Sequence, residues 1–359
     1  MVQVHEGDLT GVLIVNSGTP DEASPEAVKR FLISMLSDRH LIQVNRLLWW
    51  FILHLFIAPK RSKVVAQKYA QIWTSEGSPL KCIQDSLALK LEANLRANHY
   101  NVVVESAYNY SSPDIPTAVG SLRDKGCTRI ILLPLYPQSA FSTTTSVIDS
   151  FHQALEKLKW EPPYEIIENY YNNEVYLNAL VETIRQAGFD QSAGDTLLVS
   201  FHAIPHTDVM AGDTYEKQSY ATANGLARKL QLSEGDWFMG YQSNFGKAED
   251  WSGPLSENLL APIAKKTKGR LFYICPGFSI DCLETYFDVL QESKTQYLNA
   301  RAKVRGESND GDFIYISSLG EDSKHVKVLT NVLEPYMERS ASCLNRQRSQ
   351  RVRQLSYSA

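Results

Sequence analysis

The chain lacks most of the short motifs that mark cofactor and metal sites. Neither G-x-G-x-x-G nor G-x-x-x-x-G-K-[ST] follows an apolar run, and "NSGTPDE" has one glycine where a phosphate cradle needs several free backbone N–H groups. No G-x-S-x-G, H-E-x-x-H or C-x-x-C occurs, which disfavours a serine hydrolase of the nucleophile-elbow type and a closed zinc site. We therefore expect neither a nucleotide cofactor nor a zinc cage.

An excess of one charge, paired cysteines and a leader sequence are missing too. A net charge of −4 over 359 residues argues against nucleic acid as a partner. The five cysteines have no paired spacing, which is typical of reduced, cytoplasmic thiols. "MVQVHEGDLT" has neither a basic start nor an apolar run, so we expect no secretory signal. These features predict a cytoplasmic protein.

The longest apolar run, "LLWWFILHLFIAP", covers residues 47–59 and is broken by His54. It is too short to cross a bilayer, which needs about 20 residues. The run is either a buried core helix or an exposed lip that touches a membrane or an apolar ligand. The lip is favoured by the flanking residues, because tryptophans followed by basic side chains are typical of interfacial segments. These flanking residues are Trp49, Trp50, Lys60, Arg61 and Lys63.

Short apolar runs alternate with helical patterns along nearly the whole chain. Most runs are continuously apolar, as parallel strands covered on both faces require, so the alternation predicts an α/β fold. Eight strands could close a single barrel. We prefer two doubly wound halves, because "EPPYE" at 161–165 resembles a linker between two four-strand sets. The expected strands are 11–18, 102–109, 129–137, 164–170, 195–203, 237–243, 270–278 and 312–319.

The expected domains follow from this division. Residues 1–160 form an N-terminal domain, and residues 161–322 form a C-terminal domain. Residues 323–340 form a helix that packs across both domains, and residues 341–359 form a basic tail with four arginines and no acidic residue. Ligands of doubly wound folds bind at the C-terminal ends of the strands, so the residues at those ends are the candidates for a site.

An acidic pattern follows the strand end at "CPGF". Glu284, Asp288 and Glu292 recur at four-residue spacing, on one face of a helix that Asp281 can cap. Such a pattern is commonly a solvated helix face. However, neighbouring carboxylates repel one another unless a cation visits them. A row of oxygen ligands that starts at a strand end offers a path for a divalent metal or for protons.

"LLVSFHAIPHTDV", residues 197–209, carries His202 to the point where a buried strand ends. A histidine there is either a hydrogen-bonded structural residue or a group that takes up a proton near neutral pH. A carboxylate partner on the acidic helix favours the second interpretation. Aromatic residues also gather at the strand ends, which suits core packing or a large, flat, apolar ligand.

Two long segments, "SFHAIPHTDVMAGDTYEKQ" and "CPGFSIDCLET", closely resemble the signature segments of ferrochelatases, which insert ferrous iron into a porphyrin to make haem. "NSGTPD", "GSPL", "LPLYPQ", "YQSNFG" and "YISSL" also match, so the resemblance covers about residues 8–335. It implies two Rossmann-like domains, each with a parallel four-stranded sheet, and a porphyrin cleft between them. It also implies a lyase that inserts Fe²⁺ into protoporphyrin IX and releases two protons, the terminal step of haem biosynthesis.

The resemblance also implies roles for individual residues. His202 matches the residue that receives the pyrrole protons or contacts the metal, with Glu284 opposite it. Asp288 and Glu292 match positions proposed to carry metal or protons. Iron is a substrate, and no organic cofactor is implied. The positions expected at the porphyrin are Ser17, Tyr69, Ser78, Asn109, Tyr110, Phe278 and Asp281.

Residues 41–59 resemble the apolar lip over the family's cleft mouth, which touches the membrane in some members. We therefore expect residues 47–58 to make peripheral contact with the inner face of the cytoplasmic membrane. Some relatives hold a [2Fe–2S] cluster on C-terminal cysteines, but only Cys343 lies in that region here, so we expect the bacterial type without a cluster. No apolar helix follows the domains, so no C-terminal anchor is expected.

Two alternative functions fit the same fold. One is a related chelatase that inserts Co²⁺ or Ni²⁺ into a more polar tetrapyrrole, and the other is a carrier of haem or metal without turnover. The apolar lip favours a less polar porphyrin, and the acidic row favours turnover. The sequence does not decide whether the substrate is protoporphyrin or coproporphyrin, or from which side the metal enters. It also does not decide whether the protein is a monomer or a dimer. Positions that depart from the family pattern are Ser17, Asn109, Ser111, Phe141 and Asn244.

Overall fold

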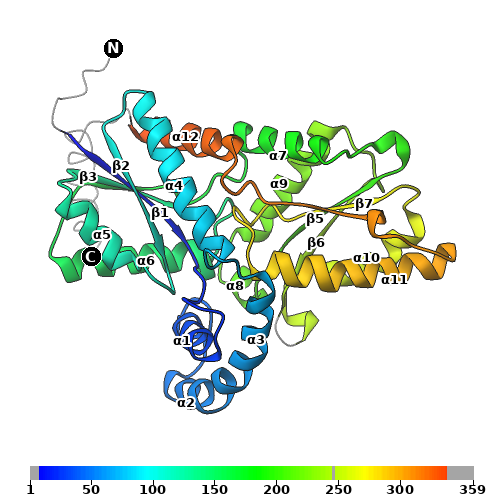
Figure 1. Cartoon of the computed structure of the whole chain (residues 1–359), viewed down its shortest axis with the longest axis horizontal. Helices are drawn as coiled ribbons and strands as arrows, with labels where there is room; N and C mark the ends of the chain where they lie inside the picture. The colour runs from blue at the N-terminus through cyan, green and yellow to red at the C-terminus, as the bar shows by residue number, and fades with distance from the viewer. Residues whose placement is uncertain (1–7, 245–246, 338–359) are drawn as a thin grey trace.

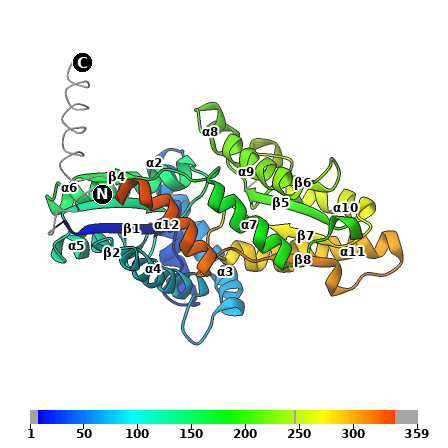
Figure 2. The same cartoon turned by 90° about the horizontal axis from the view of Figure 1, so that it is seen from above.

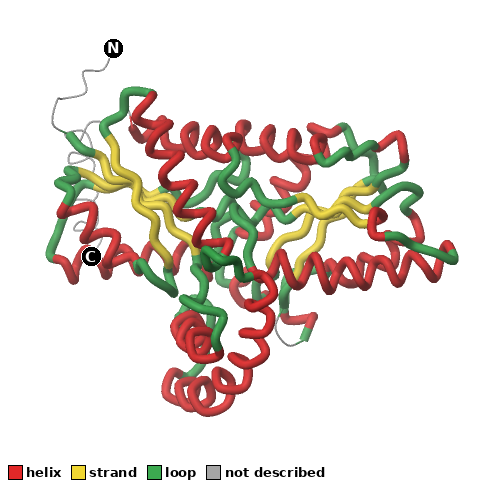
Figure 3. Tube along the Cα trace, viewed as in Figure 1, coloured by secondary structure: helices red, strands yellow, loops and turns green. Residues whose placement is uncertain are grey.

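The computed structural model describes residues 8–244 and 247–337. Two parallel sheets lie at opposite ends of the long axis of the molecule, and loops fill the region between them (Figure 1, Figure 3). Helices lie above and below each sheet, and a smaller lobe of helices projects from the N-terminal half (Figure 3). The predicted fold class, two doubly wound halves with four parallel strands each, is confirmed, and the single barrel is excluded.

The first sheet has the strand order β2-β1-β3-β4. Its central strand β1 is buried throughout, which is why it is continuously apolar. Its side chains alternate between two cores: Val12 and Ile14 pack on the side of α4, and Leu13 and Val15 on the side of α5 and α6. The bounds are β1 Thr10–Asn16, β2 Val102–Tyr108, β3 Arg129–Pro134, β4 Tyr164–Ile166, α4 Pro79–Ala97, α5 Ile115–Asp124 and α6 Ser146–Leu158.

The expected domain boundary at residues 160–161 needs correction. Strand β4 pairs with β3, and the N–H of Ile130 donates to the carbonyl of Pro163. Two prolines before β4 are tolerated because β4 is the edge strand of this sheet. "EPPYE" is therefore the entry to the last strand of the first half, and the chain crosses to the second half after Ile166.

The second sheet has the strand order β6-β5-β7-β8. Leu197, Val199 and Phe201 of β5 pack on the side of α7 and α9, while Leu198 packs on the side of α10 and α11. The bounds are β5 Thr196–His202, β6 Trp237–Gln242, β7 Leu271–Ile274, β8 Phe313–Ile316, α7 Glu174–Gln186, α9 Tyr215–Leu230, α10 Ser256–Lys266 and α11 Lys294–Arg305.

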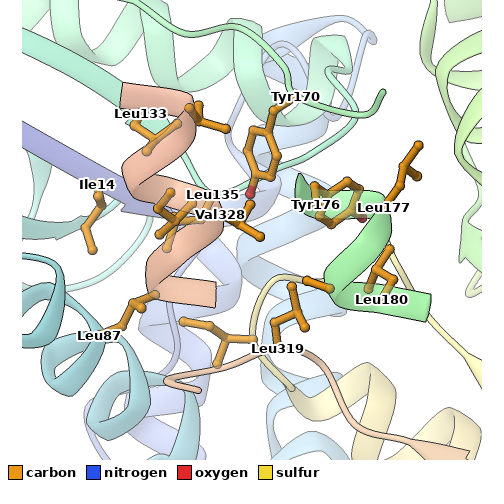
Figure 4. Packing of buried hydrophobic residues seen from close by; sticks show 14 of the residues in the cluster. Ile14, Leu87, Leu133, Leu135, Tyr170, Tyr176, Leu177, Leu180, Leu319 and Val328 are labelled. Carbon is orange, nitrogen blue, oxygen red and sulfur yellow. The ribbon is translucent and has the colours of Figure 1, made fainter. Parts of the chain in front are cut away.

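Helix α12, Ser323–Met337, contacts α4 of the first half and α7 of the second. It crosses the middle of the molecule when this is seen from above (Figure 2). One apolar cluster continues through both halves here: Val328 packs near Ile14 and Leu87 on one side, and Leu319 lies toward Leu180 on the other (Figure 4). Residues 338–340 of the expected helix and the expected tail 341–359 lie outside the described residues.

The projecting lobe contains the apolar run. Ser24 caps α1, since its hydroxyl accepts from the N–H of Ala27. Leu47 and Phe56 are 71% and 68% exposed, whereas Leu53 is fully buried. The run is therefore an exposed lip held by a few inward side chains. No helix in the described part of the chain is long and apolar enough to cross a membrane. The bounds are α1 Pro25–Leu36, α2 Arg46–Ile52, the π-helix η1 Leu53–Ile57 and α3 Ala58–Ile72.

Short helical segments complete the described chain. They include α8, which follows β5, and η5, a π-helix ten residues long that follows β7. Both begin near the ends of second-sheet strands, where this architecture places its sites. The bounds are η2 Phe141–Thr145, η3 Gln191–Ala193, α8 His206–Met210, η4 Ala248–Asp250, η5 Glu284–Ser293 and η6 Asp310–Asp312.

Candidate active site

A cleft of about 460 Å³ lies between the two halves. Its walls come from the loop after β1, the start of α4, the ends of β5 and β6, the π-helix η5, and helices α1 and α3 of the lobe. Phe31, Leu32, Met35 and Ile72 give the lobe side an apolar lining. The cleft thus combines strand ends, an acidic helix and an apolar cover.

Most of the predicted site residues line this cleft. The four candidates for proton and metal chemistry come from two elements, the end of β5 and the π-helix η5. The candidates for porphyrin binding that reach the wall come from the loop after β1, from α3, from the start of α4, and from the loop before η5. The lining residues are His202, Glu284, Asp288, Glu292, Ser17, Tyr69, Ser78 and Asp281.

Three predicted substrate residues do not line the cleft. The Asn109 amide donates to the Ser146 hydroxyl oxygen over 2.6 Å, and the Tyr110 hydroxyl donates to the Asp38 carboxylate over 2.6 Å. Both side chains therefore fasten the loop after β2 to neighbouring elements. Phe278 packs against the core between the second sheet and α10–α11. A family resemblance places residues by motif, whereas the direction of each side chain depends on its local partners.

His202 ends β5 and is half-buried. Its ring Nδ1 lies 2.7 Å from the carbonyl oxygen of Ala203. A carbonyl oxygen can only accept, so Nδ1 is the donor, and in the neutral ring Nε2 is then the acceptor. A hydrogen bond of this kind fixes the tautomer of a histidine that binds metal or takes up a proton. The Nδ1 hydrogen bond agrees with the structural interpretation of His202, and proton uptake at Nε2 stays a prediction.

The acidic segment has a different winding from the expected α-helix, and its cap is different. Glu284–Ser293 forms a π-helix, a winding that occurs mostly in short pieces at functional sites. Asp281 does not cap it, because its carboxylate accepts from the Tyr315 hydroxyl over 2.5 Å and from the Ser318 N–H over 3.3 Å. The turn is closed instead by Cys282 and Thr285, whose backbone and hydroxyl groups bond reciprocally.

The three carboxylates of η5 face the cleft rather than bulk solvent alone. Asp288 accepts from the Ser243 hydroxyl over 2.9 Å, and Glu284 accepts from the Cys282 thiol over 2.8 Å. Burial, and then repulsion by Glu284, raise the pKa of Asp288 above its ordinary value. Such a carboxylate takes up a proton more readily than an exposed one. Within residues 8–244 and 247–337, no three His, Cys, Asp or Glu side chains converge into a metal cage.

Tyr69 lies on the lobe side of the same cleft and is buried. Burial raises the pKa of its phenol, and the negative charge of Glu284 raises it further. The group therefore stays protonated and can only present an O–H or its lone pairs. Nearby, the Thr19 hydroxyl donates to the Ser78 hydroxyl oxygen over 2.9 Å. This part of the wall is polar but uncharged.

Lys68 and Gln242 are among the residues of the cleft wall that the sequence pattern does not indicate. Gln242 ends β6 in register with His202. Its amide oxygen accepts from the hydroxyls of Ser200 and Tyr273 over 2.8 and 3.1 Å. Its amide nitrogen is buried and has no hydrogen-bond partner among the described residues. "YQSNFG" matches a family motif, and the expected strand 237–243 places Gln242 near a strand end, which is a usable signal.

The sequence match to known proteins covers nearly the whole described chain. A model of the family described as Ferrochelatase matches residues 9–336. A protein named Ferrochelatase from Nitrosococcus oceani is 37% identical over 328 residues, which cover 91% of this chain and 87% of that protein. A protein with the same name from Actinobacillus pleuropneumoniae is 39% identical over 324 residues, which cover 90% of this chain and 97% of that protein.

Solved structures with the same fold are much more distant in sequence. "SirB from Bacillus subtilis with Fe3+" has a TM-score of 0.55 at 12% identity and covers 90% of this chain and 94% of its own. A second structure is the sirohydrochlorin chelatase SirB from Bacillus subtilis subspecies spizizenii in complex with cobalt. It has a TM-score of 0.52 at 11% identity and covers 92% of this chain and 96% of its own. At this level of identity the similarity establishes the two-domain fold alone.

Proposed function

Because the chain belongs to the ferrochelatase family, we propose that it inserts Fe²⁺ into protoporphyrin IX and forms haem, as the terminal step of haem biosynthesis. The reaction is that of a lyase acting on metal–nitrogen bonds. Four porphyrin nitrogens bind the iron, and the two pyrrole N–H groups each release a proton. One observation carries the proposal: His202 and the three carboxylates of η5 line a single cleft.

His202 is the proton acceptor in this mechanism. The Ala203 carbonyl holds the Nδ1 proton, so a proton from a pyrrole nitrogen goes to Nε2. The resulting imidazolium has two N–H donors, and the same carbonyl then accepts from a charged partner, which strengthens the hydrogen bond. The ring therefore keeps its orientation while its charge changes. Proton transfer by a positioned side chain typically contributes about 10²–10⁴-fold to a rate.

The iron and the protons move along three carboxylates of η5, those of Glu284, Asp288 and Glu292. One Fe²⁺ enters and two protons leave in each turnover, so a row of oxygen ligands serves both movements. Glu284, at the start of η5, is half-buried, whereas Glu292, near its end, is 59% exposed. This gradient of exposure supports exchange with solvent at Glu292 and chemistry nearer Glu284. The apolar lobe side, with Phe31 and Met35, suits the face of a macrocycle.

The lip supports a second part of the proposal, peripheral contact with the inner face of the cytoplasmic membrane. Large apolar side chains are exposed on α2 and η1, and basic residues follow at the start of α3. Apolar side chains can enter the headgroup region of a bilayer while neighbouring cations meet acidic lipids. The exposed apolar residues are Leu47, Leu48, Trp50, Phe51, Leu55 and Phe56.

A steady-state absorbance assay tests the proposed activity. The protein is incubated with protoporphyrin IX, a coproporphyrin or sirohydrochlorin, each with Fe²⁺, Co²⁺ or Ni²⁺ under anaerobic conditions. We expect multiple turnovers with protoporphyrin IX and Fe²⁺. Faster turnover of sirohydrochlorin with Co²⁺ or Ni²⁺ would indicate the related chelatase instead. A spectral change that stops at one equivalent would indicate a carrier.

A further inference from the structure

Lys68 reaches from one wall of the cleft to the acidic row on the other. It belongs to α3, whereas the carboxylates belong to η5. Its ammonium lies 3.4 Å from Glu292 Oε1 and 3.9 Å from Asp288 Oδ1. The same ammonium stands 3.8 Å from the centroid of the Phe287 ring. One cation therefore serves the two outer carboxylates and an aromatic face at once.

These contacts hold Lys68 in place only weakly. Its side chain is 27% exposed, and those of Asp288 and Glu292 are 30% and 59% exposed, so solvent screens both ion pairs. Pairs of this kind typically contribute less than about 1 kcal/mol. A lysine ammonium is a point charge on a flexible four-carbon stem, without the fixed geometry of an arginine fork. A divalent cation carries twice the charge and can bind both carboxylates directly.

We propose that Lys68 is a tethered counter-cation that competes with Fe²⁺ for Asp288 and Glu292, and so sets the metal concentration at which the site fills. The proposal rests on the proposed function, because it takes the metal as a substrate that passes along η5. An arriving Fe²⁺ displaces the ammonium from the carboxylates, and the ammonium returns when the metal moves on toward Glu284. The outer end of the row is therefore never left without a neutralising charge.

A purely structural link between α3 and η5 is the competing explanation. The structure already has such a link beside Lys68, because the Gln291 amide donates to the Gln71 amide oxygen over 3.1 Å. This hydrogen bond joins the same two elements without any charge. If Lys68 served only to join the walls, its positive charge would not matter to metal binding. Charge is thus the property that separates the two explanations.

The experiment compares four variants of the full-length protein. Lys68→Met removes the charge and shortens the unbranched side chain by only one atom, and its thioether can still pack on the Phe287 ring. Lys68→Arg keeps the charge. Lys63→Met removes an exposed lysine from the same helix, and Gln71→Ala removes the uncharged link. For each protein, calorimetry with Co²⁺ and no porphyrin gives the metal Kd, and steady-state assays give KM for Fe²⁺ and for porphyrin.

We expect Lys68→Met to bind Co²⁺ about three- to tenfold more tightly than wild type, as befits the loss of one partly screened charge. Its KM for Fe²⁺ should fall to a similar extent, with an unchanged KM for porphyrin. Lys68→Arg, Lys63→Met and Gln71→Ala should keep the wild-type Kd. If Lys68→Met is misfolded by circular dichroism, Lys68→Gln takes its place with the same expectation.

Two results would overturn the inference: a wild-type Kd in folded Lys68→Met, or equal tightening in Gln71→Ala. The proposed function fails separately. If no protein turns over porphyrin and yet Lys68→Met binds Co²⁺ more tightly, the activity is wrong and the role of Lys68 stands. If all proteins turn over and the metal Kd does not change, the role of Lys68 is wrong and the activity stands.

Discussion

His202 Nδ1 donates a hydrogen bond to the carbonyl oxygen of Ala203, with 2.7 Å between the nitrogen and the oxygen. The partner is the next residue along the chain, so the orientation of the imidazole is set by the backbone where β5 ends. Nε2 is left as the acceptor on a ring that lines the cleft. The end of the strand thus determines which ring nitrogen of His202 is directed to the cleft.

The carboxylates of η5 should differ in their effects on kcat and on the KM for Fe²⁺. Glu284→Gln removes the carboxylate at the start of η5, and we expect kcat to fall about 100-fold, within the usual range for a group that handles protons. Glu292→Gln removes a carboxylate that is 59% exposed, and we expect mainly a higher KM for Fe²⁺. Steady-state kinetics in both substrates separates the two effects. Equal losses of kcat in both variants would contradict the gradient.

Asp281 should contribute more to the stability of the fold than to the binding of porphyrin. Its buried carboxylate accepts hydrogen bonds from Tyr315 and from Ser318. Asp281→Ala leaves those donors unpaired, so we expect the free energy of unfolding to fall by about 2–4 kcal/mol. Urea unfolding measures this change, and fluorescence titration measures the porphyrin Kd, which we expect to stay within twofold. A large loss of porphyrin affinity at full stability would instead support the substrate role expected from the sequence.

His325 should make the protein less stable in acid. Burial lowers the pKa of its imidazole to about 4, from an ordinary value of 6.5, in spite of the hydrogen bond to the Gly320 carbonyl. As pH falls below 6.5, the unfolded chain binds this proton before the folded chain does. Stability is therefore full above pH 6.5 and declines toward pH 4, by about 2 kcal/mol between pH 7.5 and pH 5.

Urea unfolding at pH 7.5 and pH 5 checks this decline against a His325→Asn variant. An asparagine amide can still donate to the Gly320 carbonyl but does not titrate in this range. We expect the variant to lose less stability than wild type over the same pH interval. Identical losses in the two proteins would show that other groups cause the pH dependence.

The lip should bind anionic bilayers through its apolar side chains. Leu47 and Phe56 are 71% and 68% exposed, and a double Leu47→Ser, Phe56→Ser variant removes much of that apolar surface. At about 25 cal/mol per Å² of buried apolar area, we expect vesicle binding to weaken about tenfold or more. Cosedimentation with phosphatidylglycerol vesicles measures it. Leu89→Ser, on α4 and equally exposed at 73%, is the matched control and should bind like wild type.

The sequence was most informative where local pattern and fold position agree. All eight expected strands are present because a parallel strand must be apolar on both faces, and a run such as "TGVLIVN" satisfies that by itself. His202 could be placed at a strand end for the same reason. The boundary near residue 160 was wrong because prolines before an edge strand resemble a linker.

Other features depend on contacts between distant parts of the chain. The π-helical winding was not predictable, because the spacing of Glu284, Asp288 and Glu292 fits one face of an α-helix equally well. Lys68 lies 220 positions before Asp288 in the sequence, so only the packing of α3 against η5 reveals their ion pair. The directions of the Asn109 and Tyr110 side chains depend on Ser146 and Asp38, which no motif joins to them.

The most direct test of the central claim is the rate of Fe²⁺ insertion into protoporphyrin IX by wild type and by His202→Ala. We expect wild type to turn over many times, and the variant, folded by circular dichroism, to lose at least about 100-fold in kcat. Its porphyrin Kd, measured by fluorescence, should stay close to that of wild type. A folded His202→Ala protein that inserts iron at the wild-type rate would contradict the mechanism proposed for this cleft.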